Sequence, residues 1–326
     1  MSKRVLITGA AGFVGANLAR RLLRDGHEVH LLLRGAQDAW RIEALRADVR
    51  LHPADLEDRA AVAQTVARAR PEWVFHLAAH GAYSWESDAR RIAATNVVGT
   101  ANLIDACLRT GFEVLVNTGS SSEYGLKDHP PGEDEPLEPN SQYAATKASA
   151  TLLCRCTARS RNVRMPTLRL YSVYGPYEEP NRVVPALIVY GMRGALPPLT
   201  NPDTGRDFVY VDDVVDAYLL AATRNATDPA AVYNVGSGTQ TSLRTLVELA
   251  RRTLGVAAEP VWGTMQDRSW DTTVWFADPR KIAAELGWRP AHTLEDGFRR
   301  TVDWLRADDS MARLYADRLA RSPGQP

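Results

Sequence analysis

Two side chains in the middle of the chain have the residue types and the spacing of a proton-transfer pair. Tyr143 and Lys147 stand one helical turn apart, so on a helix they share one face. A free tyrosine has a pKa of about 10, and a neighbouring ammonium group lowers that pKa by stabilising the phenolate. The pair is therefore predicted to exchange a proton with a substrate hydroxyl. This spacing alone arises often by chance, so its weight depends on what surrounds it.

A serine-rich segment precedes this pair in the chain. Ser120, Ser121 and Ser122 follow an apolar run at 114–117 that has the character of a strand. The carboxyl ends of strands in parallel sheets are where ligands bind. We expect one of these hydroxyls to hydrogen-bond the reacting oxygen of the substrate and the others to belong to a turn.

Alternating strands and helices are expected to hold these residues in place. Apolar runs predict strands at 5–7, 29–33, 49–51, 73–77, 114–117, 208–211 and 232–235. Helical spacing of apolar residues predicts helices at 16–25, 62–69, 96–107 and 214–222. This alternation is typical of an α/β fold with a doubly wound parallel sheet that is covered by helices on both faces.

The alternation is interrupted after residue 175. Prolines crowd the span 176–202, which excludes a long uninterrupted helix there, and the polar tail 307–326 is expected to fray. A second irregular region holds Trp262, Trp270 and Trp275. We expect a smaller α+β substrate-binding lobe beside the sheet domain, with the ligand in the cleft between them. The expected division is 1–175 with 206–236 for the sheet domain, and 176–205 with 237–326 for the lobe.

Three glycines stand between the first expected strand and the first expected helix. Gly9, Gly12 and Gly15 have the spacing G-x-x-G-x-x-G, and Phe13 and Val14 lie within it. Glycines allow a tight turn and let backbone amides approach a pyrophosphate at the positive end of the helix. Their position predicts a dinucleotide-binding loop, so that a nicotinamide could exchange a hydride while Tyr143 exchanges the proton.

The second strand ends in Arg34, where the adenosine ribose of a dinucleotide would lie. An acidic residue there would accept the ribose hydroxyls of NAD, whereas an arginine can pair with a 2′-phosphate. The arginine favours NADP(H), with NAD(H) as the alternative, unless Arg34 is only an exposed turn residue. Asp55, which precedes Leu56 after the third strand, would accept from the adenine amino group or else cap a helix.

Composition excludes several classes of protein. The 326 residues contain 39 Lys plus Arg and 39 Asp plus Glu, and this zero net charge argues against a nucleic-acid binder. No apolar run reaches the roughly 18 residues of a membrane span, and no signal-peptide pattern follows the start. Three cysteines provide neither a disulfide framework nor a four-ligand zinc site. We expect a cytoplasmic protein with no metal centre and no membrane or nucleic-acid partner.

Together these motifs resemble the extended short-chain dehydrogenase/reductase family, and within it the NAD(P)-dependent epimerase/dehydratase group that acts on nucleotide sugars. The resemblance rests on the glycine loop, Leu77-Ala78-Ala79, the serine run, Tyr143 with Lys147, and the stretch 206–213. It implies a Rossmann fold, a nucleotide-diphosphate sugar as substrate, and a homodimer formed through the helices near 96–107 and 143–159.

The resemblance also implies roles for individual residues. The catalytic hydroxyl matches Ser120 in an ungapped alignment, and Ser121 if one residue is missing before Tyr124. Arg206 and Arg268 match arginines that contact the nucleotide. The residues expected at the cofactor are Gly9, Gly12, Phe13, Val14, Gly15, Arg34, Asp55, Leu56, Leu77, Ala78, Ala79, Tyr143 and Lys147. Those expected at the substrate, besides the two arginines, are His80, Ser84, Ser122, Glu123 and Ser172.

Departures from the family pattern separate the candidate reactions. Sugar 4,6-dehydratases carry an Asp-Glu or Ser-Glu pair just after the catalytic threonine, and in the ungapped alignment those places hold Ser121 and Ser122, with Glu123 one residue late. Deprotonating a carbon beside a ketone needs a placed carboxylate, so dehydration is disfavoured unless one residue is missing before Tyr124. Ser172 replaces the usual asparagine, which weakens an assignment to the common UDP-galactose epimerases, and Arg34 replaces their usual acidic residue.

The reaction expected from these residues is NADPH-dependent reduction of a 4-keto, often 6-deoxy, nucleotide sugar. The alternative is 4-epimerisation with retained cofactor, and dehydration comes third. A non-catalytic NADP sensor on the same fold would have lost Tyr143 or Lys147, and both are present.

Overall fold

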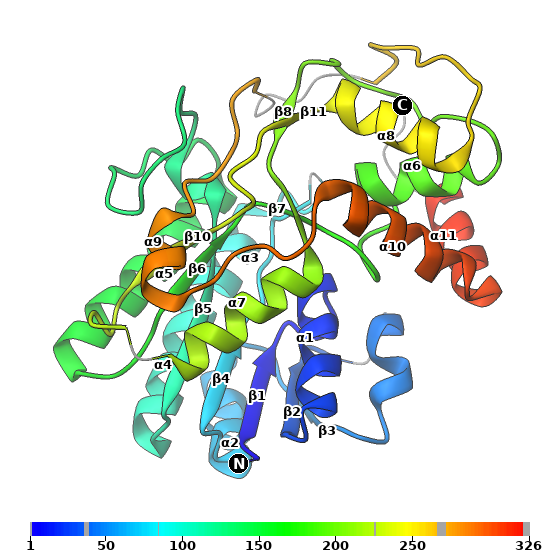
Figure 1. Cartoon of the computed structure of the whole chain (residues 1–326). Coiled ribbons are helices and arrows are strands. Elements are labelled where there is room, and N and C mark those ends of the chain that lie inside the picture. The colour runs from blue at the N-terminus through cyan, green and yellow to red at the C-terminus, as the bar shows by residue number, and fades with distance from the viewer. Residues whose placement is uncertain (1, 36–38, 84, 225, 266–271, 322–326) are drawn as a thin grey trace.

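A seven-stranded parallel sheet forms the centre of the protein (Figure 1). The computed structural model describes residues 2–35, 39–83, 85–224, 226–265 and 272–321. The strand order is β10-β6-β5-β4-β1-β2-β3, and every neighbouring pair is parallel. This order confirms the expected doubly wound sheet. The strands are β1 (Arg4–Thr8), β2 (Glu28–Leu33), β3 (Arg50–Pro53), β4 (Trp73–His76), β5 (Val114–Ser120), β6 (Thr167–Leu170) and β10 (Val232–Val235).

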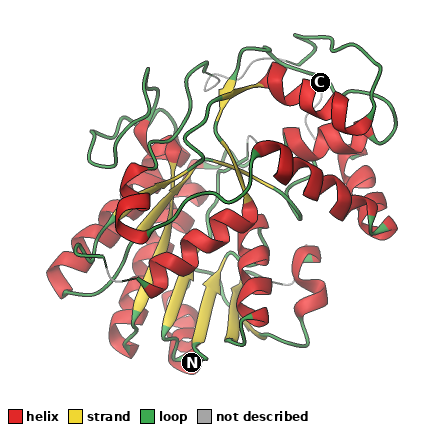
Figure 2. Ribbon diagram, in the orientation of Figure 1, coloured by secondary structure: helices red, strands yellow, loops and turns green. Residues whose placement is uncertain are grey.

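Helices cover both faces of this sheet (Figure 2). One face carries α1 (Phe13–Arg24), α7 (Val211–Thr223) and α9 (Arg280–Leu286), and the other carries α2 (Arg59–Ala69), α4 (Gly99–Thr110) and α5 (Gln142–Arg161). Successive side chains of a strand point to opposite faces, so Ile7 of β1 joins the first apolar core and Leu6 joins the second. Both residues are fully buried, which explains the continuous apolar runs in the sequence.

The remaining elements pack around a third apolar core beside the carboxyl edge of the sheet. Four helices contribute to it: α6 (Val183–Gly191), α8 (Leu243–Leu254), α10 (Leu294–Arg306) and α11 (Asp309–Ala320). Two short strand pairs connect this part to the sheet: β7 (Ser172–Tyr174) with β9 (Phe208–Tyr210), and β8 (Gly205–Arg206) with β11 (Thr241–Ser242). Within the proline-rich span, Pro185 occupies the first turn of α6, where no amide hydrogen is required for the helix.

Two boundaries differ from the sequence-based expectation. The tail does not fray over 309–320, because α11 buries Tyr315, whose hydroxyl donates to the Glu178 carbonyl at 2.7 Å. The helix expected at 96–107 begins earlier, with α3 (Ala89–Ala93), a π-helical turn η2 (Ala94–Val98) and then α4. A short 3₁₀ segment, η1 (Trp40–Leu45), lies between β2 and β3.

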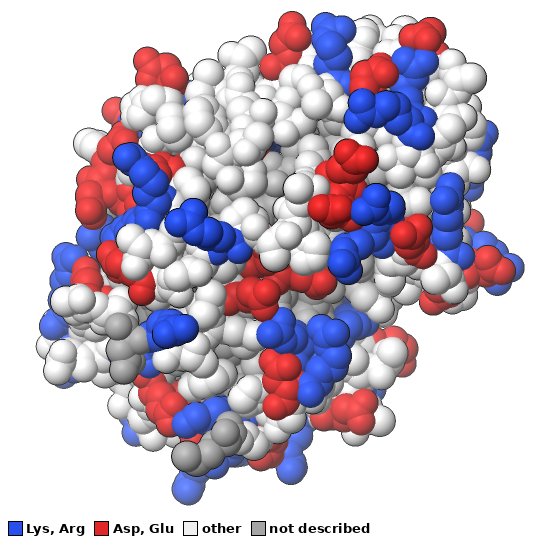
Figure 3. Space-filling view, viewed as in Figure 1, with Lys and Arg blue, Asp and Glu red and all other residues white. Residues whose placement is uncertain are grey.

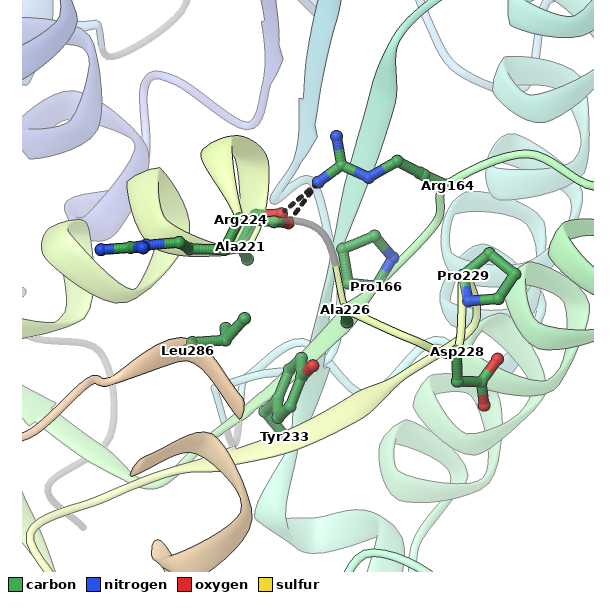
Figure 4. A pocket seen from close by; sticks show the side chains of 9 residues that line it. All are labelled: Arg164, Pro166, Ala221, Arg224, Ala226, Asp228, Pro229, Tyr233 and Leu286. Carbon is green, nitrogen blue, oxygen red and sulfur yellow. Dashed lines mark hydrogen bonds between the residues drawn. The ribbon is translucent and has the colours of Figure 1, made fainter. Parts of the chain in front are cut away.

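Arg164 fixes the C-terminal end of α7 beside β6 (Figure 4). Its guanidinium donates to the carbonyls of Ala221, Ala222 and Arg224 at 3.3, 3.2 and 2.6 Å. A cation at the last turn satisfies carbonyls that have no partner within the helix and complements the helix dipole. The interaction therefore fixes α7 against the sheet.

A buried ion pair connects the end of β5 to β6. After β5 the chain forms a 3₁₀ turn, η3 (Ser121–Tyr124), and Glu123 in this turn is completely buried. One carboxylate oxygen accepts from the Ser120 amide at 2.9 Å and from the Thr151 hydroxyl at 3.0 Å. The other accepts from Arg169 Nε at 2.9 Å, and Arg169 itself is only 1% exposed.

This arrangement differs from the expectation that Glu123 contacts the substrate. Both of its oxygens are engaged inside the protein, and its charge is balanced by Arg169. A buried carboxylate without such partners would carry a large desolvation penalty. The hydrogen bonds of this carboxylate therefore link β5, β6 and α5.

We predict that Glu123→Ala lowers the free energy of unfolding by about 3–5 kcal/mol, because it leaves the Arg169 guanidinium buried without a counter-charge. Denaturant unfolding followed by circular dichroism measures this change. Glu43→Ala is the matched control, since Glu43 pairs with Arg46 at the exposed surface and its loss is expected to cost about 0–1 kcal/mol. Equal unfolding of the two variants would contradict the structural role of Glu123.

Candidate active site

The glycine loop between β1 and α1 forms a tight turn in which Gly9 and Gly15 have no space for a side chain. Gly9 has a φ of 74°, and a Cβ at this position would lie 2.5 Å from the backbone nitrogen of Ala78. A Cβ at Gly15 would collide with the carbonyl oxygen of Gly9. Gly12 precedes α1, and no side chain caps the helix amides there. The uncapped positive end of α1, with no Cβ in front of it, fits the pyrophosphate of a dinucleotide.

The segment that follows β4 lies against this loop. The Leu77 amide donates to the carbonyl of Thr8 at 3.1 Å, and the Ala78 amide lies 3.3 Å from the Thr8 hydroxyl. Leu77 and Ala78 are half-buried, and Ala79 is exposed. Leu77, Ala78 and Ala79 are therefore placed beside the glycine loop, as the sequence predicts for cofactor-binding residues.

The ends of β2 and β3 provide the other candidates for the cofactor. Arg34 is exposed just after β2, and within the described residues no hydrogen bond or ion pair engages its side chain. Asp55 follows β3, and its carboxylate accepts from the Glu57 amide at 3.0 Å. Leu56 is buried against Gly99, where a Cβ would lie 2.7 Å from the Leu56 Cβ. All of these residues follow the carboxyl ends of β2 and β3, the two strands on one side of β1.

The structure brings Tyr143 into contact with the serine run. Ser141 caps α5 by accepting from the Ala144 amide at 3.1 Å, which places Tyr143 in the first turn of the helix. The Ser120 side chain lowers the pKa of Tyr143, which places the two hydroxyls close to each other. Ser120 Oγ also accepts from the Ser122 amide at 3.2 Å, which fixes its position at the start of η3. The effect of Ser120 on the pKa of Tyr143 favours Ser120 over Ser121 as the hydroxyl beside the tyrosine.

Burial governs the protonation of this pair. It raises the pKa of Tyr143 to about 12, and the Ser120 side chain offsets only part of that shift, while Glu123 and Glu86 raise the pKa further. Burial also lowers the pKa of Lys147, which is 3% exposed. This differs from the expectation that Lys147 makes the phenol unusually acidic, because removing the phenolate from water outweighs the favourable interactions. Tyr143 is consequently a neutral phenol at neutral pH.

Asn96 joins the segment after β4 to the helix that carries Tyr143. Its side-chain oxygen accepts from the His80 amide at 2.8 Å, and its nitrogen donates to the His80 carbonyl at 2.8 Å and to the Thr146 hydroxyl at 3.0 Å. Asn96 lies in the π-helical turn η2, a geometry that recurs at functional sites. The sequence analysis missed this residue, because an asparagine at the first position of the helix expected at 96–107 is an ordinary choice there.

Glu86 organises the loop that follows His80. Its carboxylate lies 3.0 Å from His80 Nδ1 and accepts from the amides of Gly81 at 2.9 Å and Tyr83 at 3.3 Å. The effect of Glu86 and Tyr83 on the pKa of Tyr143 places this loop within electrostatic range of the phenol. Glu86 and Asn96 therefore fix His80 on the loop that influences Tyr143.

The remaining expected substrate residues lie on the lobe side of the sheet edge or outside the described structure. Ser172 begins β7, and its amide donates to the Asp207 carbonyl at 2.9 Å. Arg206 lies on β8, with its guanidinium 5.9 Å from the ring centre of Trp275. Ser84 and Arg268 lie outside the described residues.

On the face shown in Figure 3, acidic and basic side chains are intermingled, and no large patch carries a single sign of charge. Among the described residues, no group of histidine, cysteine, aspartate and glutamate side chains could hold a metal ion. No helix in that part of the chain is both long and apolar enough to cross a bilayer.

Comparison with known proteins identifies the family. Residues 5–236 match the NAD dependent epimerase/dehydratase family. The dTDP-glucose 4,6-dehydratase of Streptomyces griseus is 34% identical over 316 residues, which cover 93% of this chain and 94% of the relative.

Two solved structures share the fold closely. The UDP-glucose 4-epimerase of Thermotoga maritima, determined with UDP-glucose, has a TM-score of 0.84 and 29% identity, covering 93% of this chain and 98% of that one. The UDP-glucose 4-epimerase of Thermus thermophilus, determined with NAD, has a TM-score of 0.83 and 30% identity, with the same coverage of 93% and 98%. With its glycine loop, its Tyr143–Lys147 helix and a family match over most of its length, this chain belongs to the NAD dependent epimerase/dehydratase family of extended short-chain dehydrogenase/reductase enzymes.

Proposed function

We propose that this enzyme transfers a hydride between NAD(P)(H) and a carbon of a nucleoside-diphosphate sugar, and that its reaction is the reduction of a 4-keto-6-deoxyhexose. The observation that carries the proposal is a Tyr143 phenol whose pKa burial raises to about 12 and which the Ser120 side chain is close enough to influence. Reduction of a carbonyl requires a proton donor beside the oxygen, and a neutral phenol is one. The solved relatives that hold UDP-glucose and NAD support this substrate and cofactor class.

The proposed reaction assigns one role to each residue. The dinucleotide, held by the glycine loop and by Arg34, would supply the hydride to the sugar carbon. Tyr143 donates its proton to the carbonyl oxygen, and Ser120 orients that oxygen through its hydroxyl. The positive charge of Lys147 then favours the phenolate that remains. Residues 1–175 with 206–236 would bind the dinucleotide, and 176–205 with 237–326 the nucleotide sugar.

The chain lacks the carboxylate that dehydration would need at the serine run. Ser121 and Ser122 occupy the positions after the catalytic hydroxyl. Glu123 is the nearest carboxylate in the sequence, and it is engaged by Arg169, Thr151 and a backbone amide. Because these contacts occupy Glu123, they favour a reaction that consists of hydride and proton transfer without loss of water.

The second candidate is 4-epimerisation with a retained cofactor, which the close structural match to two UDP-glucose 4-epimerases favours. The same tyrosine and serine would serve both reactions, because epimerisation consists of oxidation at a carbon and re-reduction from the other face. The two functions differ in cofactor consumption.

A set of nucleoside-diphosphate 4-keto sugars and 4-hydroxy sugars, followed by NADPH absorbance and product analysis, distinguishes these reactions. We expect one NADPH to be oxidised for each 4-keto sugar reduced, because each product keeps the transferred hydride. Conversion of a 4-hydroxy sugar without added cofactor would instead establish the epimerase. Turnover of neither class would overturn the proposed function.

Tyr143→Phe is expected to lower kcat by about 10²–10⁴-fold, because it removes the proton donor, while the affinity for the dinucleotide stays unchanged. Steady-state kinetics and a cofactor titration measure the two effects. Ser149→Ala on the same helix is the matched control, since its exposed hydroxyl bonds only the Ala145 carbonyl. A Tyr143→Phe enzyme as active as the control would remove Tyr143 from the mechanism.

Arg34→Ala is expected to weaken NADP⁺ binding by about tenfold or more and to leave NAD⁺ binding almost unchanged. An exposed guanidinium without an internal partner can pair with a 2′-phosphate, and such charge-assisted bonds contribute about 1.5–3 kcal/mol. Calorimetric titration of both nucleotides measures the ratio, with Arg46→Ala as a surface control. A wild-type enzyme that prefers NAD⁺ would show that Arg34 does not select NADP⁺ over NAD⁺.

We also propose a homodimer that buries the outer faces of α4 and α5. Val98 is 51% exposed at the start of α4, and Leu152 is 54% exposed on α5. Leu152→Arg is expected to convert the dimer to a monomer in sedimentation experiments, whereas Leu126→Arg, at an equally exposed leucine elsewhere, leaves it intact. A monomeric wild-type protein would disprove this assembly.

A further inference from the structure

A basic cavity opens at the edge of the sheet opposite the candidate active site. The starts of β1, β2 and β3 and the end of α2 enclose about 550 Å³. In Figure 1 this edge lies at the bottom, near the N-terminus, whereas the glycine loop lies at the other end of β1. The cavity is lined by Arg4, Glu28, His30, Arg50, His52, Arg68, Ala69 and Arg70.

The charge in this cavity is not balanced. Four arginines and one carboxylate line it, and a second carboxylate, Glu72, lies 3.6 Å from the Arg4 guanidinium, although the chain as a whole has no net charge. The lining carboxylate, Glu28, is already engaged by Arg50 Nε at 2.7 Å and by His30 Nε2 at 3.2 Å. In the described part of the chain, the side chains of Arg68 and Arg70 have no hydrogen bond and no ion pair. The guanidinium groups of Arg68 and Arg70 therefore have all their N–H donors available for a ligand.

Arg70 occupies a backbone position that suits glycine. It ends α2 with a φ of 41° and a ψ of 56°, the left-handed region that a Cβ disfavours. Its carbonyl accepts from Arg4 Nε at 2.9 Å, so this turn also fixes the Arg4 side chain at the cavity. Arg70 thus adopts a backbone conformation that favours glycine, and its carbonyl positions Arg4. This combination indicates that the Arg70 side chain has a function at the cavity.

Two histidines form the inner wall of the cavity. The rings of His30 and His52 are stacked with their centres 5.1 Å apart, and His30 Nδ1 lies 2.9 Å from His52 Nε2. Burial lowers the pKa of both histidines, and Arg50 lowers both further, although Glu28 raises that of His30. The inner wall therefore consists of neutral imidazoles beside the guanidinium groups. An anion bound by the guanidinium groups would not have to displace these imidazoles.

We propose that this cavity binds a small polyphosphate anion, such as pyrophosphate or the phosphate chain of a nucleotide. Guanidinium groups match phosphate oxygens in bidentate geometry, and several of them around one cavity suit a ligand with several charges. The volume is within the range of about 300–1,000 Å³ typical of small-ligand sites. The site is separate from the catalytic edge, because the same three strands carry Gly9, Arg34 and Asp55 at their opposite ends.

Calorimetric titration with pyrophosphate tests the proposal on the full-length enzyme. We expect binding to wild-type protein, and a loss of affinity of tenfold or more in the double variant Arg68→Gln with Arg70→Gly. Arg206→Gln, at the candidate substrate site, is the control and is expected to bind pyrophosphate as the wild type does. Glycine suits the backbone at position 70, so the double variant is also expected to melt no lower than the wild type.

Four results would overturn the proposal. Pyrophosphate that does not bind the wild-type enzyme, or that binds the double variant equally well, removes the site. A loss of binding in Arg206→Gln alone would place the anion in the catalytic cleft instead. Inorganic phosphate that binds as tightly as pyrophosphate would show that the cavity selects no polyphosphate.

Discussion

One buried carboxylate determines where the reacting groups of this enzyme lie. Glu123 accepts from the amide of Ser120, from the hydroxyl of Thr151 on α5, and from the guanidinium of Arg169 on β6. It thereby joins the end of β5, which carries the serine, to the helix that carries Tyr143. The approach of Ser120 to Tyr143 depends on this junction, because neither side chain alone fixes the distance between the two elements.

The same burial that fixes these groups also determines their charge. A tyrosine removed from water resists ionisation, and burial lowers the pKa of Lys147 as well. A protein that needs a proton donor benefits from this, since the phenol keeps its proton until a reacting oxygen takes it. In the proposed reaction, the cation of Lys147 would act after the transfer, when a negative charge has formed on the phenol. Packing and catalysis are thus consequences of one desolvated environment.

Local patterns in the sequence predict the sheet and the motif residues well. Apolar runs identify most of the main strands, and the glycine spacing places the dinucleotide loop, because both signals lie within a few neighbouring residues. The pairing of Glu123 with Arg169 could not be predicted in this way, since the two residues are 46 positions apart. Asn96 was missed because a π-helical turn has no periodicity of its own. The direction of the Tyr143 pKa also escaped the sequence, because helical spacing shows a neighbouring charge but not the depth of burial.

The protonation of Tyr143 in the free enzyme is the most direct measure of this account. Tyrosine labelled with ¹³C at the ring carbon that bears the hydroxyl, assigned with the Tyr143→Phe variant, reports it through the chemical shift during a pH titration. The account predicts that this resonance stays in the phenol form from about pH 6 to beyond about pH 10, the ordinary tyrosine pKa. A resonance that titrates to phenolate near neutral pH would show that Lys147 outweighs burial, and would contradict the central claim.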